Sequence, residues 1–349
     1  MNILSLIYFI LILGLIVLVH EIGHFIFAKI FGVYVHEFSI GMGPKIFSKK
    51  KKNWETTYSL RAIPLGGYCS LAGEEVEEDK DIPKKRKLQG KPAWQRFLIM
   101  FFGAGNNFIL ALLLLFSIGI FFGSTDQTPY ISSVKEDAPA AIAGIEAKDK
   151  VLRINNHKVS SIDDISLYIT IAPKDKPISF KIEKPNGDIK TYKVKTKKEK
   201  VDGKEIRIVG ITLQGEAQKG FVSSLKYTFI KFKSIIKQMV VVVGSLFTGK
   251  LSINNLSGPV GIYTIVDSQA KAGLASILYL IAYLSINVGF INLIPLPAFD
   301  GGRILFLIIE KIKGSPVKAS TENLIHNIGF ILLIILMIYI TIHDIITLF

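Results

Sequence analysis

The alternation of apolar and polar stretches divides the chain into segments apolar enough to cross a membrane and a polar central region. Apolar runs at residues 3–28, 97–122 and 324–346, and a fourth that begins near residue 276, are long enough for helices that cross a bilayer. Residues 221–250 differ, because lysines interleave with apolar positions in the first half and only residues 239–247 are strongly apolar. We expect that segment to lie in the membrane interface rather than to span it.

Two stretches between the first and second apolar runs alternate in the manner of strands. Residues 37–44 and 54–60 predict a small β-sheet close to the membrane. Its edge could bind an extended peptide by strand addition, or the two strands could form a simple packing hairpin. Basic runs at residues 49–52 and 84–87 favour the cytoplasmic side for this region, residues 34–91.

These patterns predict an α-helical polytopic membrane protein with about four transmembrane helices, a small membrane-associated β-sheet and one inserted α/β domain. The predicted parts are an N-terminal membrane part (1–123), a soluble domain (124–216), an interfacial amphipathic helix with its connection (217–275) and a C-terminal membrane part (276–349). The positions of the basic runs and the number of membrane crossings place both termini and the soluble domain outside the cytoplasm.

Composition supports a membrane protein and narrows its partners. Half of the residues are hydrophobic (50%), and the mean hydropathy is +0.42. A net charge of +14 fits anionic lipid headgroups better than nucleic acid, because the sequence contains no basic module of a nucleic-acid-binding fold. The single cysteine, Cys69, excludes an intramolecular disulfide and a cysteine zinc site.

The first apolar run contains the sequence His-Glu-Ile-Gly-His at residues 20–24. On a helix, His20 and His24 face the same way, which allows both imidazoles to bind one Zn²⁺ while Glu21 acts on water. A chance match and a signal peptide are the alternatives. A signal peptide fits poorly, because no basic segment precedes the run and its apolar character resumes after the motif. Ionisable groups at membrane depth indicate function.

A second informative stretch, residues 292–302, combines two prolines and two glycines with Asp300. We expect a helix broken inside the bilayer, which is tolerated where the backbone lines an enclosed cavity. Asp300 would supply the third ligand that a zinc ion held by two histidines needs. The alternative is a structural ion pair between Asp300 and Arg303. His326 and His343 are expected at the membrane interface, and residues 103–107 are expected to allow close helix packing.

The soluble region looks like a PDZ domain of the type found in bacterial proteases. The resemblance rests on the Pro-Ala-Ala helix and Ala-Gly-Ile turn of residues 138–145 and on the strand pattern of residues 149–155. Such a domain could capture a peptide by strand addition or act as a steric gate, and the sequence favours neither.

Together these stretches resemble the site-2 protease family, in its bacterial regulator-of-sigma-E protease branch. The motifs that carry the resemblance are residues 20–24, 38–43, 66–68, the insert, 256–261 and 292–302. The resemblance implies one Zn²⁺ per chain bound by His20, His24 and Asp300, Glu21 as the general base, and substrate contacts by Asn292 and Asn287. It also implies single-pass transmembrane substrates, such as anti-sigma factors or remnant signal peptides, cleaved by regulated intramembrane proteolysis in the bacterial cytoplasmic (inner) membrane.

Two features depart from the family pattern. The proline of the family's Ala-Gly-Pro-x-x-Asn motif is missing from residues 102–107, and one PDZ-like region stands where the branch has two. Rival functions are a zinc transporter and a catalytically silent scaffold that presents the soluble domain. A transporter should show further metal-binding side chains along the other helices, and a scaffold gives no reason for a glutamate beside two ligands.

Overall fold

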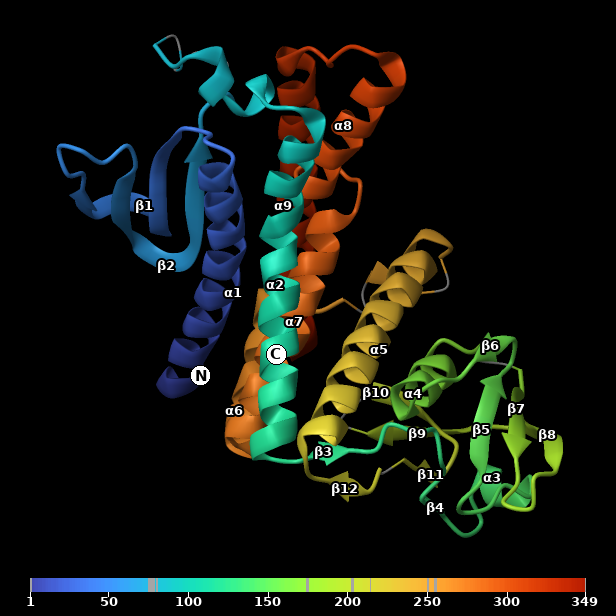
Figure 1. Cartoon of the computed structure of the whole chain (residues 1–349). Coiled ribbons are helices and arrows are strands. Elements are labelled where there is room, and N and C mark those ends of the chain that lie inside the picture. Colours follow the sequence, from blue (N-terminus) through green and yellow to red (C-terminus); the bar gives the residue numbers. More distant parts are fainter. Residues whose placement is uncertain are drawn as a thin grey trace. The chain divides into compact units, whose positions relative to one another are not determined.

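The structure is a computed structural model that describes residues 2–74, 79, 81–173, 176–201, 204–213, 215–249, 251–253 and 256–348. It divides into two units, one formed by Met1–Leu114 with Ile253–Phe349 and the other by Leu115–Ser252 (Figure 1). Each unit is described by itself.

Four helices are long and apolar enough to cross a membrane, as the hydrophobic pattern predicts. They are α1 (Ile3–Ile30), α2 (Ala93–Phe121), α7 (Leu274–Leu293) and α9 (Ala319–Leu348). Large apolar side chains stay exposed along them, for example Leu11 on α1 and Leu332 on α9. An all-round apolar helix with exposed leucines is typical of a lipid-facing segment. The multi-pass membrane character predicted from the sequence is therefore confirmed.

Two shorter helices complete the first unit. Helix α8 (Asp300–Lys313) follows α7 after a six-residue break, and α6 (Pro259–Ala272), which the hydrophobic pattern did not predict, packs against α1. The Ser5 hydroxyl donates to Asp267 of α6 at 2.6 Å, and Asp344 of α9 accepts the backbone N–H of Gly261 at 2.8 Å. Helix α6 thus ties the start of α1 to the end of α9.

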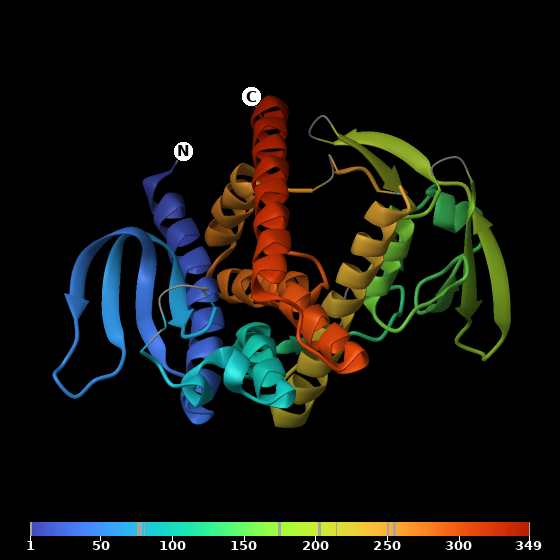
Figure 2. The same cartoon turned by 90° about the horizontal axis from the view of Figure 1, so that it is seen from above.

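The predicted small sheet is present, but its strands are longer than expected. Strands β1 (Val35–Lys49) and β2 (Thr57–Leu71) pair antiparallel, and the predicted second strand begins three residues late, at Thr57. Residues 37–40 pair on one side with the first half of β2 and on the other side with its second half, and residues 45–49 pair with the first half again. Four segments therefore lie side by side, in the order 45–49, 57–61, 37–40 and 67–71. Figure 2 shows this sheet beside α1, on the side away from α9. Two short 3₁₀ turns follow, Lys84–Arg86 and Leu88–Gly90.

The second unit contains the soluble region. Its four-stranded antiparallel sheet has the order β6-β5-β7-β8, and Phe180, Ile154 and Ile165 are fully buried in one hydrophobic core. The elements are β3 (Ser124–Thr125), β4 (Ser133–Val134), α3 (Pro139–Ile142), β5 (Lys150–Ile154), β6 (His157–Lys158), α4 (Ile162–Thr170), β7 (Ile178–Glu183), β8 (Ile189–Val194), β9 (Lys197–Val201), β10 (Lys204–Ile208), β11 (Ile211–Thr212) and β12 (Ala217–Gln218). The α/β character is as predicted, and the PDZ assignment stays a prediction.

The amphipathic segment forms one continuous helix, α5 (Phe221–Phe247), which is not among the four candidate membrane spans. Two of its lysines pair with acidic residues of the same unit. Lys231 and Lys237 form ion pairs with Asp163 and Asp164 at the start of α4, at 2.7 and 2.8 Å. These two charges therefore attach α5 to α4, and the interfacial placement of the helix stays a prediction.

Candidate metal centre

His20 and His24 lie one turn apart on α1, and both side chains are buried. Their Nε2 atoms are 3.1 Å apart. The Nδ1 atom of His24 lies 2.9 Å from the backbone carbonyl oxygen of Ile99 in α2, so it donates its hydrogen to that oxygen. The hydrogen bond fixes the tautomer and leaves the lone pair of Nε2 facing its neighbour. The regular periodicity of α1 therefore places two ligand atoms side by side.

A close crossing of α1 and α2 frames the two imidazoles. A Cβ on Gly23 would lie 1.9 Å from the carbonyl oxygen of Phe102, and a Cβ on Gly103 would lie 2.4 Å from the ring of His24. Neither distance is possible for a real side chain, so both positions need glycine. The close packing predicted for residues 103–107 is confirmed at Gly103, where it also makes room for the ligands.

Asp300 reaches the same point from the break between α7 and α8. Its Oδ2 atom lies 3.2 Å from Nε2 of His20 and 3.3 Å from Nε2 of His24. One detail of the expectation is wrong: the two glycines do not break the helix, since Gly301 and Gly302 lie in the first turn of α8. They allow this turn to pack on the carbonyls of residues 293, 294 and 296, because a Cβ at either glycine would come within 2.5 Å of those carbonyls.

The donor set fits a zinc ion. Three ligand atoms, from His20, His24 and Asp300, lie within 3.3 Å of one another. Bonds of roughly 2.0–2.1 Å to a tetrahedral zinc place its ligands about 3.3 Å apart. Oδ2 of Asp300 is buried and has no hydrogen-bond partner among the described residues, and a cation would compensate its charge. Two imidazoles and a carboxylate leave the fourth position of a tetrahedron open, as catalytic sites do.

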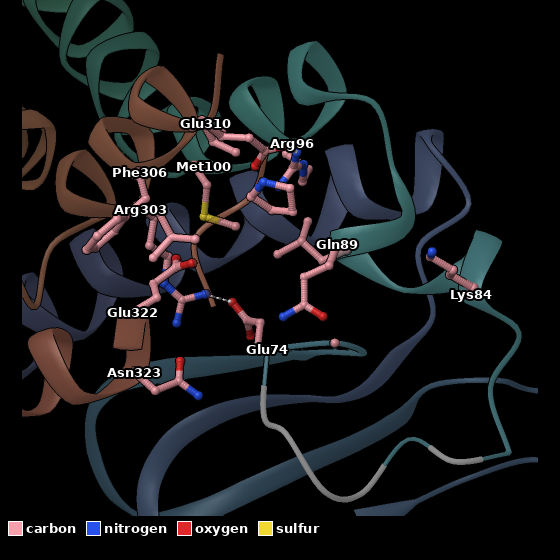
Figure 3. A pocket seen from close by; sticks show the side chains of 15 residues that line it. Glu74, Lys84, Gln89, Arg96, Met100, Arg303, Phe306, Glu310, Glu322 and Asn323 are labelled. Atoms are coloured by element: carbon pink, nitrogen blue, oxygen red, sulfur yellow. Dashed lines mark hydrogen bonds and ion pairs between the residues drawn. The ribbon is translucent and has the colours of Figure 1, made fainter. Parts of the chain in front are cut away.

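Arg303 does not pair with Asp300, contrary to the alternative that the sequence left open. Its guanidinium donates instead to Glu74, which follows β2, and a second ion pair joins Arg96 of α2 to Glu310 of α8. Figure 3 shows the ion pair between Arg303 and Glu74, two of the residues that line a cavity of about 280 Å³. Helix α8 is therefore attached through charges both to the sheet and to α2.

The sheet approaches the centre on the side of Glu21. A Cβ on Gly67 would lie 3.0 Å from Cγ of Glu21, so the outer segment 67–71 packs directly on this side chain. Cys69 in the same segment is buried; burial raises the pKa of its thiol, and the carboxylates of Glu21 and Glu74 add to that effect. The thiol stays neutral, which agrees with a centre built from histidine and carboxylate.

The two asparagines assigned by resemblance lie on α7. Asn292 is half-buried in its last turn, and Oδ1 of Asn287 is buried without a hydrogen-bond partner among the described residues. Nδ1 of His326 accepts a hydrogen bond from the backbone N–H of Ala298, a contact that the sequence did not predict, and its place at the interface stays a prediction. The three-residue spacing of His326 and Gly329 on α9 is the signal that could have pointed to this contact, since such residues share a helix face.

Comparison with known proteins supports a zinc-dependent peptidase. Residues 8–336 match Peptidase family M50. The chain is 37% identical to a Fusobacterium nucleatum protein named as a putative zinc metalloprotease, with 97% of each chain covered, and 35% identical to one of the same description from Clostridium perfringens, with 95% of each covered. It is 33% identical to the probable protease eep of Enterococcus faecalis, with 98% of each covered over an alignment of 428 positions.

Proposed function

Because this chain belongs to peptidase family M50 and is a zinc metallopeptidase of the membrane, we propose that it cleaves transmembrane segments of other proteins within the bilayer. The observation that carries the proposal is the meeting of His20, His24 and Asp300 inside the membrane part. One zinc ion per chain at this point would act as a Lewis acid on the scissile carbonyl and make water a stronger nucleophile.

Glu21 is the proposed general base. It follows His20 on α1, and its Cγ packs on the backbone of Gly67. A carboxylate at this position takes a proton from the attacking water and then gives it to the amine that leaves. The proposal needs no other titratable side chain for proton transfer.

The outer segment of the sheet is the proposed place for the substrate backbone. Residues 67–71 pair on one side with residues 37–40, and among the described residues no strand pairs with their other side. A substrate that adds a strand there would be held extended beside Glu21, with its carbonyls accessible. A transmembrane helix must unwind before it can bind in this way, because its carbonyls are otherwise used within the helix.

Asn292 and Asn287 are proposed to hold the substrate backbone or the developing oxyanion. Amide side chains are suited to this role because they both donate and accept hydrogen bonds. The unpartnered Oδ1 of Asn287 supports a ligand in its neighbourhood, since buried polar atoms are otherwise hydrogen-bonded.

The zinc-transporter alternative receives less support. Among the residues that the structure describes, His20, His24 and Asp300 form the one group of three or more metal-binding side chains. A transport path would need further ligands along the helices, because an ion crossing a bilayer must be coordinated at each stage.

The finer assignments extend the same proposal. We place the protein in the bacterial cytoplasmic membrane, with residues 124–216 on the extracytoplasmic side, in contact with membrane lipids. The proposed substrates are single-pass proteins such as anti-sigma factors or remnant signal peptides in regulated intramembrane proteolysis. Residues 124–216 are proposed as a PDZ domain that binds a peptide or gates the centre.

A Glu21→Gln variant tests the mechanism. Cleavage of a model transmembrane substrate by the full-length enzyme in lipid nanodiscs should fall by about 10²–10⁴-fold, while the zinc content stays at one per chain. Glu183→Gln in β7 is the matched control and should cleave normally. Full activity of Glu21→Gln with zinc bound would contradict the assigned role. Loss of zinc on Asp300→Ala tests the ligand set separately.

A further inference from the structure

The break between α7 and α8 contains a backbone conformation that alanine rarely adopts. Ala298 has φ of +75°, in the left-handed region, and it stands two residues before Asp300. A non-glycine residue in this region is strained and persists only where its surroundings hold it. Within the break the N–H of Phe299 donates to the carbonyl of Leu296 at 3.4 Å, and contacts from outside the break add to this long hydrogen bond.

Helix α9 supplies two contacts to the break. Nδ1 of His326 accepts the backbone N–H of Ala298 at 3.1 Å. One turn further along α9, a Cβ on Gly329 would lie 2.4 Å from Cβ of Pro297 and 2.9 Å from its carbonyl carbon. His326 and Gly329 are three residues apart and share a face of the helix. One thus provides an acceptor, and the other allows the turn to approach closely.

His326 also contacts the chain after Asp300. A Cβ on Gly302 would lie 3.2 Å from Cε1 of His326, so the imidazole packs against the first turn of α8 as well as against Ala298. The ring therefore touches the backbone on both sides of Asp300. Displacement of this ring would free both ends of the segment that presents the carboxylate.

We propose that His326 and Gly329 are positioning residues of the metal centre. They hold the turn at Pro297 and Ala298, and thereby keep Oδ2 of Asp300 within reach of the two imidazoles. This inference rests on the proposed role of Asp300 as a ligand. If the turn relaxes, only a fraction of molecules has the third ligand in place, and the apparent zinc affinity is the intrinsic affinity multiplied by that fraction.

A His326→Leu variant of the full-length protein tests the proposal. Zinc affinity, measured by competition with a chelator in detergent, should weaken about 10-fold, and cleavage at limiting zinc should fall with it. His326→Asn should retain most of the affinity, because the amide oxygen can accept the same hydrogen bond. The matched control is His343→Leu, a histidine near the other end of α9, which should bind zinc as the wild type does.

A second pair of variants changes the turn itself instead of its contact on α9. This test therefore does not depend on the folding of His326→Leu. Ala298→Gly removes the strain and should keep the zinc affinity, whereas Ala298→Val places a β-branched side chain at positive φ and should lower it at least about 10-fold. Equal zinc affinities for these two variants would overturn the proposal, as would equal affinities for wild type and His326→Leu.

The design separates failure of this inference from failure of the proposed function. If Asp300→Ala loses zinc but His326→Leu and Ala298→Val do not, Asp300 is a ligand whose position does not depend on α9. If Asp300→Ala binds zinc as the wild type does, the proposed centre itself is wrong. Only a loss in all three, with His343→Leu and Ala298→Gly unaffected, supports the positioning role.

Discussion

The ligands of the candidate centre come from two very different pieces of backbone. His20 and His24 lie on a continuous helix of 28 residues, and its periodicity puts them on one face, where their Nε2 atoms are 3.1 Å apart. Asp300 instead follows a break that contains two prolines and an alanine at positive φ. The histidines also need α2, through the hydrogen bond of His24 to Ile99, whereas Asp300 depends on contacts from α9 and on the ion pair between Arg303 and Glu74. Substitutions in the two regions should therefore weaken zinc binding for different reasons.

The largest effect is expected where the regular region is most crowded. A Gly103→Ala variant would place Cβ 2.4 Å from the His24 ring, so the imidazole must move or the two helices must separate. Zinc affinity should fall by about 100-fold in a chelator competition assay. Gly105→Ala is the matched control, because a Cβ there meets only the phenyl rings of Phe101 and Phe102. Equal losses for the two variants would argue against a specific role for the crossing.

A smaller effect is expected when α8 loses its attachment to the sheet. Arg303→Gln removes the partner of Glu74 one turn after Asp300, and zinc affinity should weaken by about 10-fold at most. Reversal of both charges, with Arg303→Glu and Glu74→Arg together, should recover part of the loss. Lys313→Gln, an exposed lysine at the end of the same helix, serves as the control. An Arg303→Gln variant with normal affinity would show that α9 holds the broken region without this ion pair.

A third variant should change stability without changing the centre. Asp344→Ala removes the carboxylate that accepts the N–H of Gly261 in the first turn of α6, where an acidic group is favourable. The protein should unfold at lower temperature, with a loss of about 1 kcal/mol, and zinc affinity should not change. His343→Ala, at the neighbouring position, is the control. A weaker zinc affinity in Asp344→Ala would mean that the two ends of α9 are coupled.

The sequence predicts the helix that carries the two histidines better than it predicts the broken region that carries Asp300. Helical spacing is visible in the letters, so the pairing of His20 with His24 and the four membrane segments could be predicted. The meeting of these histidines with Asp300 needed the chemical argument that zinc requires a third ligand. No pattern indicated that Arg303 would pair with Glu74, because such a contact joins residues 229 positions apart and depends on tertiary packing.

Elements without a strong hydrophobic periodicity were not predicted, because they too depend on tertiary packing. Helix α6 has only a modest apolar face and begins at Pro259, directly after Gly258, in a region that we interpreted as a connection. Strand β2 was predicted too short, since its alternating pattern was followed only to Leu60, yet the pairing of residues 67–70 with β1 continues the strand. The contact of His326 with the N–H of Ala298 was not predicted, because it exists only in a backbone conformation that the sequence does not reveal.

An effect as small as that of Asp344→Ala concerns the sheet, and it depends on pH. Burial alone would raise the pKa of Glu37, but hydrogen bonds from Lys45, Ser59 and Arg61 outweigh it and hold the pKa below its usual value. A carboxylate with a lowered pKa contributes stability above its unfolded pKa, and that stability is lost as the pH falls through the folded value.

The sheet should therefore loosen in acid by about 1 kcal/mol, without a change in α1. Fluorescence of Trp54, which packs on Tyr58 at the start of β2, reports the transition in a Trp94→Phe background. Glu37→Gln should remove the acid-dependent loss of stability and leave a sheet whose stability is slightly lower and does not change in acid. If the transition below pH 4.5 persists unchanged in this variant, another carboxylate controls it. The edge at residues 67–71 would then be held mainly by its apolar contacts with α1 rather than by this charge cluster.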